Sequence, residues 1–262
     1  MYKPFTILFG RQWYTFTLLM MFGTMLSLIW FIYRAPHRQR AATLDIFLAG
    51  LFGGVVIGRL VHVALQWQYF VDRTPEIRKI YDEGGLDWHA VFLGALFSML
   101  LMARLRKIDL NPLLDTFAVL LPIWAILGWW ACATIGCAYG LPIERMADYP
   151  RGLTWVQPDI FGITEPRFAT QLIGIVGSIG LFGIALVLHW RDGLRGGQLW
   201  LIVLLLSMGM FGIGFLRGDF SRLLYHLRDE QWLDIGLILF AGILHIRSRV
   251  RARRQIAPEA KG

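Results

Sequence analysis

Charged residues are scarce in this sequence, and their scarcity excludes an ordinary soluble protein. Only 17% of the 262 residues are charged, whereas 56% are hydrophobic. A soluble domain has about a quarter of its residues charged. Apolar runs recur from one end of the chain to the other with only short polar gaps, which leave no room for a separate soluble domain. The composition therefore predicts a single membrane domain over residues 1–262.

Cysteine is nearly absent, since Cys132 and Cys137 are the only two. If one unbroken helix contains both, their Cα atoms lie about 8 to 9 Å apart, too far for a disulfide. We therefore expect no disulfide and interpret both residues as small packing residues. A catalytic thiol is the alternative, but it needs an activating base. Histidines are few and show no ligand-like spacing, so we expect neither a metal site nor a cofactor.

The formal net charge of +8 raises the question of nucleic acid binding. The basic residues are scattered over short segments between apolar runs and form no continuous basic stripe, so we expect no nucleic acid partner. The N-terminus lacks the layout of a cleaved signal peptide, and we expect the first apolar run to remain in the mature protein. No internal repeat is visible, which disfavours a transporter.

Seven apolar runs emerge with a window of about 20 residues. They are Tyr14–Tyr33, Leu44–Trp67, Trp88–Met102, Leu113–Tyr139, Ala169–Leu188, Gln198–Leu216 and Trp232–Ile246. The third and seventh have about 15 residues each, so each helix must extend into flanking residues or cross only part of the membrane. The pattern predicts an all-α, polytopic membrane protein with seven transmembrane helices.

The distribution of basic residues predicts the orientation of these spans. Four connecting segments carry 14 Lys or Arg and three acids, Asp109, Asp192 and Glu259. These segments are 34–43, 103–112, 189–197 and 247–262. By the positive-inside rule they face the cytoplasm, so the N-terminus is predicted outside and 247–262 forms a basic cytoplasmic tail. The longer outer segments 68–87 and 140–168 suit interfacial helices or a rim over a lipid-facing cavity.

Several polar residues fall at the predicted outer ends of the spans. Arg59 follows glycines in the second span, and an ionisable residue at this depth costs about 2.5–3.5 kcal/mol. It is therefore a functional candidate, with snorkelling to the headgroups as the alternative. His89 can act as a base or bind phosphate, or it is an interfacial residue beside Trp88. Arg217 is a second candidate or a headgroup anchor, and Gln171 can hydrogen-bond between helices.

Six short motifs occur in the order found in one known family. They are Trp13-Tyr14, Ile57-Gly58-Arg59, Gly84-Gly85-Leu86-Asp87-Trp88-His89, Arg167-Phe168-Ala169-Thr170-Gln171, Phe215-Leu216-Arg217-Gly218-Asp219 and Gln231-Trp232-Leu233. In these motifs the chain resembles the prolipoprotein diacylglyceryl transferase family of bacterial inner membranes over almost its whole length.

The chain departs from this family in the fourth span. The family signature there reads Gly-Arg-x-x-Asn-x-x-Asn-x-Glu, whereas Trp129, Cys132 and Cys137 stand at its arginine, first asparagine and glutamate. Met210 stands at a sixth-helix arginine of the family, and Asn111 is the only asparagine in the chain. With its cysteines, this segment resembles the version that divergent relatives in the family carry.

The resemblance implies transfer of diacylglyceryl from phosphatidylglycerol to the lipobox cysteine of a prolipoprotein, with release of glycerol phosphate. The implied partners are phosphatidylglycerol, the prolipoprotein signal peptide and membrane lipids, in a multi-pass protein of the inner membrane. The implied catalytic residues are His89, which accepts or relays the thiol proton, and Tyr14. The implied substrate-binding residues are Arg59, Arg217, Gln171 and Arg167. A non-catalytic lipid- or lipoprotein-binding membrane protein on the same fold is the alternative.

Overall fold

The computed structural model describes residues 4–80, 85–109, 111–191 and 196–256. Three residues used above, Gly84, Asp192 and Glu259, lie outside these ranges, as does the end of the tail from 257 to 262. The chain divides into two compact units. The first unit contains Met1–Ser27 and Leu114–Gly262, and the second contains Leu28–Leu113.

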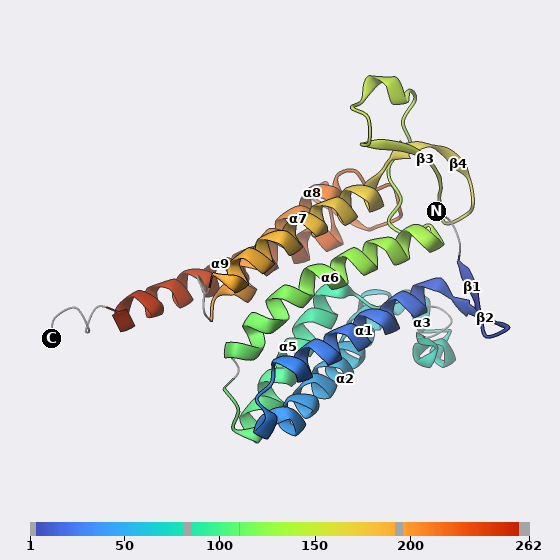
Figure 1. The fold of residues 1–262 in the computed structure, drawn as a ribbon. Coiled ribbons are helices and arrows are strands. Elements are labelled where there is room, and N and C mark those ends of the chain that lie inside the picture. Colours follow the sequence, from blue (N-terminus) through green and yellow to red (C-terminus); the bar gives the residue numbers. More distant parts are fainter. Residues whose placement is uncertain (1–3, 81–84, 110, 192–195, 257–262) are drawn as a thin grey trace. The chain divides into compact units, whose positions relative to one another are not determined.

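Helices dominate the described residues (Figure 1). They are α1 (Thr15–Arg34), α2 (Arg40–Leu65), α3 (Trp67–Phe70), α5 (Trp88–Arg106), α6 (Asn111–Ile135), α7 (Thr170–Trp190), α8 (Gln198–Gly214) and α9 (Asp229–Ile256). Each predicted apolar run coincides with one of the seven longer helices. Five of them, α1, α2, α5, α6 and α7, are long and apolar enough to cross a membrane, and α8 is a shorter apolar helix. The protein is thus a mostly helical, multi-pass membrane protein, and seven spans remain a prediction.

The third apolar run gains its missing length from the residues that follow it. Helix α5 continues past Met102 to Arg106 and has 19 residues. Asp87 caps its first turn by accepting a hydrogen bond from the Ala90 backbone N–H. Lys107 ends it in a left-handed conformation with φ of 54°. The helix therefore reaches spanning length by including a basic last turn, which suits a membrane surface.

The second unit is built on close packing of α2 against α5. A Cβ atom on Gly53 would lie 1.8 Å from the Ser98 Oγ, and one on Gly58 would lie 2.4 Å from the Val91 side chain. Small residues let two helix backbones approach closely where lipid provides no hydrophobic driving force. The glycines beside Arg59 thus serve the contact between helices.

In the first unit, α8 packs against both α7 and α9 (Figure 1). Helix α6 is joined to α1 by a hydrogen bond of 2.9 Å from the Trp124 indole N–H to the Ser27 hydroxyl. The same unit holds three antiparallel hairpins that precede α1, α7 and α9 in the chain. They are β1 (Phe5–Leu8) with β2 (Arg11–Tyr14), β3 (Thr154–Pro158) with β4 (Thr164–Phe168), and β5 (Leu223–Leu224) with β6 (Leu227–Arg228).

These hairpins correct the all-α expectation and the expectation of an interfacial helix in segment 140–168, while the alternative of a rim over a lipid-facing cavity stays a prediction. The fold is mostly helical but not all-α, and segment 140–168 forms a short 3-10 helix (Met146–Asp148) and the β3–β4 hairpin. Threonine, tryptophan and valine in Thr154–Pro158 favour a strand, which the search for long apolar runs does not detect. In segment 68–87 the described residues include the end of α3 and a 3-10 helix, Thr74–Arg78.

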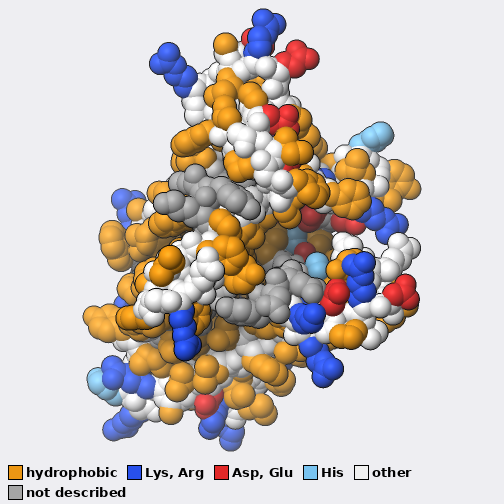
Figure 2. All heavy atoms as spheres, turned by 90° about the vertical axis from the view of Figure 1, so that its right-hand side faces the viewer, with side chains coloured by type: hydrophobic (Ala, Val, Ile, Leu, Met, Phe, Trp, Pro, Cys, Tyr) orange, Lys and Arg blue, Asp and Glu red, His pale blue; other side chains and the backbone are white. Residues whose placement is uncertain are grey.

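Hydrophobic side chains cover much of the molecular face in Figure 2. Phe52 on α2 is 73% exposed and Val176 on α7 is 60% exposed. Helices that are apolar on all sides are typical of membrane spans, because lipid covers the faces that pack against no other helix. The exposed apolar surface therefore agrees with the membrane assignment.

Candidate functional site

Arg59 lies on α2 and is enclosed by the segment that follows this helix. Its Nε donates to the Ile77 carbonyl at 2.9 Å, and its two terminal nitrogens donate to the Glu76 carbonyl at 2.7 Å and the Gly85 carbonyl at 3.1 Å. Only 5% of the residue is exposed. A snorkelling side chain keeps its charged head in water. The observed burial is therefore unlike that of a simple headgroup anchor.

Gly85 allows the chain to pass directly over Arg59. It has φ of 76°, and a Cβ atom there would lie 2.5 Å from the His62 Nε2 and 2.6 Å from an Arg59 terminal nitrogen. A larger residue would be strained and would collide with both side chains. His62, three residues after Arg59 on α2, therefore belongs to this cluster, although sequence analysis overlooked it. The spacing of three residues along a helix was the available signal.

His89 lies in the first turn of α5 and is only 2% exposed. Its Nδ1 is 3.4 Å from the Asp87 carboxylate, and its ring packs on Trp88. Burial by itself would raise the pKa of the Asp87 carboxyl. Hydrogen bonds from His89 and the Ala90 backbone outweigh this and hold that pKa below its ordinary value. Asp87 is thus an anion that orients the imidazole, a role that its place as helix cap two residues before a histidine could have indicated.

The two cysteines form a disulfide, which contradicts the sequence-based expectation. Their Cα atoms are 4.7 Å apart. Helix α6 ends at Ile135, and Gly136 and Ala138 adopt φ values of 77° and 52°. The Cys137 N–H then bonds back to the Cys132 carbonyl at 3.1 Å. The expectation was wrong because it assumed that the helix continued through Gly136, a residue typical of helix ends.

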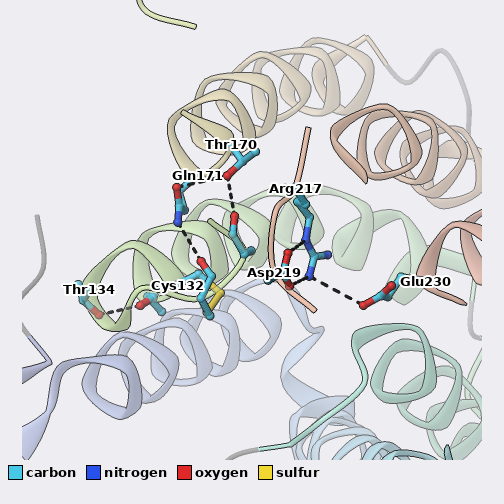
Figure 3. The surroundings of a disulfide bond; sticks show 10 residues. Cys132, Thr134, Thr170, Gln171, Arg217, Asp219 and Glu230 are labelled. Atoms are coloured by element: carbon cyan, nitrogen blue, oxygen red, sulfur yellow. Dashed lines mark hydrogen bonds and ion pairs between the residues drawn. A yellow bond between two sulfur atoms is a disulfide. The ribbon is translucent and has the colours of Figure 1, made fainter. Parts of the chain in front are cut away.

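The start of α7 is bonded to the turn that follows the disulfide (Figure 3). The Thr170 hydroxyl donates to the Ala138 carbonyl at 2.6 Å, and the Gln171 amide donates to the Cys137 carbonyl at 2.9 Å. Gln171 is only 4% exposed. Gln171 was expected to hydrogen-bond between helices, but its amide donates instead to the turn that follows α6, which uses one of its N–H groups.

Arg217 lies just after α8 and points toward two acidic residues (Figure 3). Its Nε donates to Asp219 at 2.9 Å, and a terminal nitrogen lies 3.9 Å from the Glu230 carboxylate. Burial by itself would lower the pKa of Arg217, but the hydrogen bond to Asp219 and the nearby carboxylates raise it. The side chain is 22% exposed. Arg217 is therefore a fixed cation that a ligand can approach.

Arg167 lies on β4, and its contacts hold the β3–β4 hairpin. It forms ion pairs with Asp159 at 3.1 Å and with Glu165, and it donates to the Gly140 carbonyl at 3.3 Å. These partners account for its burial without a substrate, and its predicted role in substrate binding remains a prediction. Tyr14 ends β2, where its ring packs on Phe5 with centroids 4.8 Å apart.

Five of the six predicted residues thus gather at two places, whereas Tyr14 lies on the β1–β2 hairpin. In the first unit, Gln171, Arg167 and Arg217 all contact segment 137–141, Arg217 through a β-bridge to Gly140. In the second unit, Arg59 bonds Gly85, which precedes the pair of Asp87 and His89. Among the residues that the structure describes, no group of three or more His, Cys, Asp or Glu is arranged to hold a metal ion.

Comparison with known proteins identifies the family. The family model described as prolipoprotein diacylglyceryl transferase matches residues 4–247. The phosphatidylglycerol–prolipoprotein diacylglyceryl transferase of Clostridium novyi is 28% identical over 209 residues, 79% of each chain. That of Synechococcus elongatus is 30% identical over 78% of this chain and 71% of the relative. That of Polynucleobacter necessarius is 28% identical over 88% and 89%. The chain belongs to the prolipoprotein diacylglyceryl transferase family.

Proposed function

We propose that this chain transfers diacylglyceryl from phosphatidylglycerol to the lipobox cysteine of prolipoproteins, at the outer face of the bacterial inner membrane. The curated relatives are named for the phosphatidylglycerol and prolipoprotein substrates. Membership of a transferase family favours catalysis over the alternative of a non-catalytic lipid-binding protein. The observation that carries the proposed site is Arg59, a buried cation on an apolar helix of spanning length.

The reaction sets clear demands on the site. A carbon–sulfur bond forms between the thiol and the glyceryl carbon that carries the phosphate, the carbon–oxygen bond breaks, and glycerol phosphate leaves. The thiol proton must pass to a base. Negative charge grows on the departing phosphate, so fixed cations stabilise the transition state more than the bound lipid.

Arg59, in the second unit, and Arg217, in the first unit, are each proposed to bind the lipid phosphate. The three backbone carbonyls around Arg59 fix the direction of its guanidinium, and Asp219 does the same for Arg217. Arginine presents a planar fork that matches phosphate oxygens, so each of these oriented guanidinium groups suits a phosphate ligand. Partial exposure of Arg217 leaves it open to such a ligand.

His89 is proposed as the group that takes the thiol proton. The Asp87 carboxylate lies at its Nδ1 and stabilises the imidazolium that forms. The proton of the thiol would then go to Nε2. Tyr14 and Gln171 are proposed to orient the lipid headgroup, and Arg167 remains a candidate for substrate binding.

Complementation tests the proposed activity. The chain is expressed in a bacterial strain depleted of its own transferase, and lipidation of a reporter lipoprotein is followed by its shift on a gel. We expect growth and lipidation to be restored. A well-expressed, membrane-inserted chain that binds phosphatidylglycerol vesicles without lipidating the reporter would instead support the non-catalytic alternative.

Arg59→Lys tests the phosphate site in the same assay. Lysine keeps the charge but loses the planar fork, and loss of charge-assisted hydrogen bonds worth about 1.5–3 kcal/mol corresponds to about a 10- to 100-fold decrease in turnover. Arg73→Lys, on the exposed connecting segment beside Tyr69, is the matched control and should be neutral. Unchanged lipid affinity and turnover in Arg59→Lys would assign Arg59 a structural role only.

A further inference from the structure

Segment 137–141, the five residues that begin with the second cysteine, connects two parts of the proposed site. On one side, the Phe168 N–H bonds to the Leu141 carbonyl, and Thr170 and Gln171 bond to the Ala138 and Cys137 carbonyls. On the other side, the Leu141 N–H bonds to Leu216 and the Gly218 N–H bonds to Tyr139, each at 2.8 Å. The position of Arg217 relative to α7 therefore depends on the path of this segment.

The local sequence allows this segment a second path. The apolar run of α6 continues to Tyr139, four residues beyond the observed helix end at Ile135. Ala138 has φ of 52°, an unfavourable conformation for a residue other than glycine. Continuation of α6 by one turn would relieve it, but it would carry the carbonyls of Ala138 and Tyr139 away from Thr170 and Gly218.

The disulfide excludes that second path. In a continued helix the Cα atoms of residues 132 and 137 would be about 8 to 9 Å apart, beyond the reach of a disulfide. In the observed turn they are 4.7 Å apart. The bond is thus compatible with the turn and incompatible with the continued helix. On the predicted topology it lies at the outer membrane surface, where oxidising conditions preserve disulfides.

We propose that the Cys132–Cys137 disulfide is a positioning bond. It selects the turn that places Arg217 and Gln171 for binding phosphatidylglycerol. Lipid binding therefore depends on the oxidation of this cysteine pair. The inference rests on the proposed role of Arg217 in lipid binding. Reduction by an added dithiol would yield two cysteine thiols and the oxidised dithiol. The segment would then be free to continue α6 as a helix.

The experiment compares oxidised protein, dithiol-reduced protein and Cys132→Ala/Cys137→Ala in detergent with phosphatidylglycerol and a lipobox peptide. We expect KM for phosphatidylglycerol to rise about tenfold in the reduced protein and in the cysteine-free variant, whereas KM for the peptide should change little. The cysteine-free variant should not respond to the dithiol. Adding Ala138→Gly to it relieves the left-handed strain and should restore part of the lipid affinity.

Hydrogen exchange gives a readout independent of turnover and of the variants. Reduction should increase exchange of the Leu141 and Gly218 amides, and leave the Ala90 amide at the start of α5 unchanged. The positioning role is overturned if both amides keep their protection and KM for phosphatidylglycerol stays within about twofold in active, reduced protein. Failure of the oxidised protein to transfer lipid would instead refute the proposed function.

Discussion

Three arginines that look equivalent in sequence have different surroundings. Arg59 donates to backbone carbonyls, and Arg167 is paired with Asp159 and Glu165 and is buried. Arg217 is also paired with two carboxylates, Asp219 and Glu230, but remains 22% exposed, so a phosphate can reach it without displacing them. A buried arginine that already has two carboxylate partners gains little from a phosphate, because the phosphate must displace them. At the residue scale, Arg59 and Arg217 are therefore stronger candidates for phosphate binding than Arg167.

Asp87→Asn tests the anion beside His89. Asparagine still caps α5, but it loses the charge at the helix N-terminus, and we expect a loss of about 0.5–1 kcal/mol of stability at pH 6. The folded pKa of Asp87 is below its ordinary value of 3.8, so its contribution is fully present above pH 3.8 and is lost as the pH falls through the lower folded value.

The difference in unfolding midpoint between wild type and Asp87→Asn should therefore shrink below pH 3.8. Thermal unfolding of detergent-solubilised protein from pH 3 to pH 7 measures it. The exposed Asp72→Asn is the matched control and should leave the midpoint unchanged at every pH. If the difference in unfolding midpoint between wild type and Asp87→Asn is the same at every pH, the charge of Asp87 contributes nothing to stability.

At the scale of elements, the contact between α2 and α5 depends on glycine. Gly53→Ala would place a methyl group 1.8 Å from the Ser98 Oγ. Such overpacking costs about 1–3 kcal/mol, because the helices must separate or the serine must move. We expect a lower thermal midpoint for this variant in detergent.

Gly177→Ala on α7 is the matched control for that substitution. A Cβ atom there meets nothing within 4 Å. Alanine also favours a helix over glycine by about 1 kcal/mol, so the control should be neutral or slightly stabilising. Equal midpoints for Gly53→Ala and Gly177→Ala would show that close packing of α2 on α5 does not limit stability.

At the scale of the whole molecule, the number of spans and their orientation remain to be tested. Four predicted inner segments carry 14 of the Lys and Arg residues. A reporter fused after Lys261 should therefore behave as cytoplasmic, and one inserted near Trp155 as external. Cysteine-accessibility labelling of the same two positions provides an independent check. Finding both positions on one side of the membrane would contradict the seven-span topology.

The sequence by itself determined the helices and the family. A chain segment in lipid must satisfy its backbone hydrogen bonds internally, so each of the seven apolar runs falls on a helix. The ends of the runs are less accurate, since the seventh run stops at Ile246 whereas α9 continues to Ile256. The order of short motifs, including those around Arg59 and His89, indicated the family that the comparisons then identified. The glycines before Arg59 permit either a close helix contact or space for a ligand, and the structure shows the close contact with α5.

Only the tertiary structure decided the pairing of side chains. Whether Cys132 and Cys137 meet depends on where α6 ends, and a shift of one helical turn changes their Cα separation from 4.7 Å to about 8 to 9 Å. Likewise, the partners of Arg59 and Arg167 come from loops and a hairpin whose positions depend on long-range contacts. Hydrophobic periodicity reports local burial, whereas hydrogen bonds and disulfides depend on distances set by the packed fold.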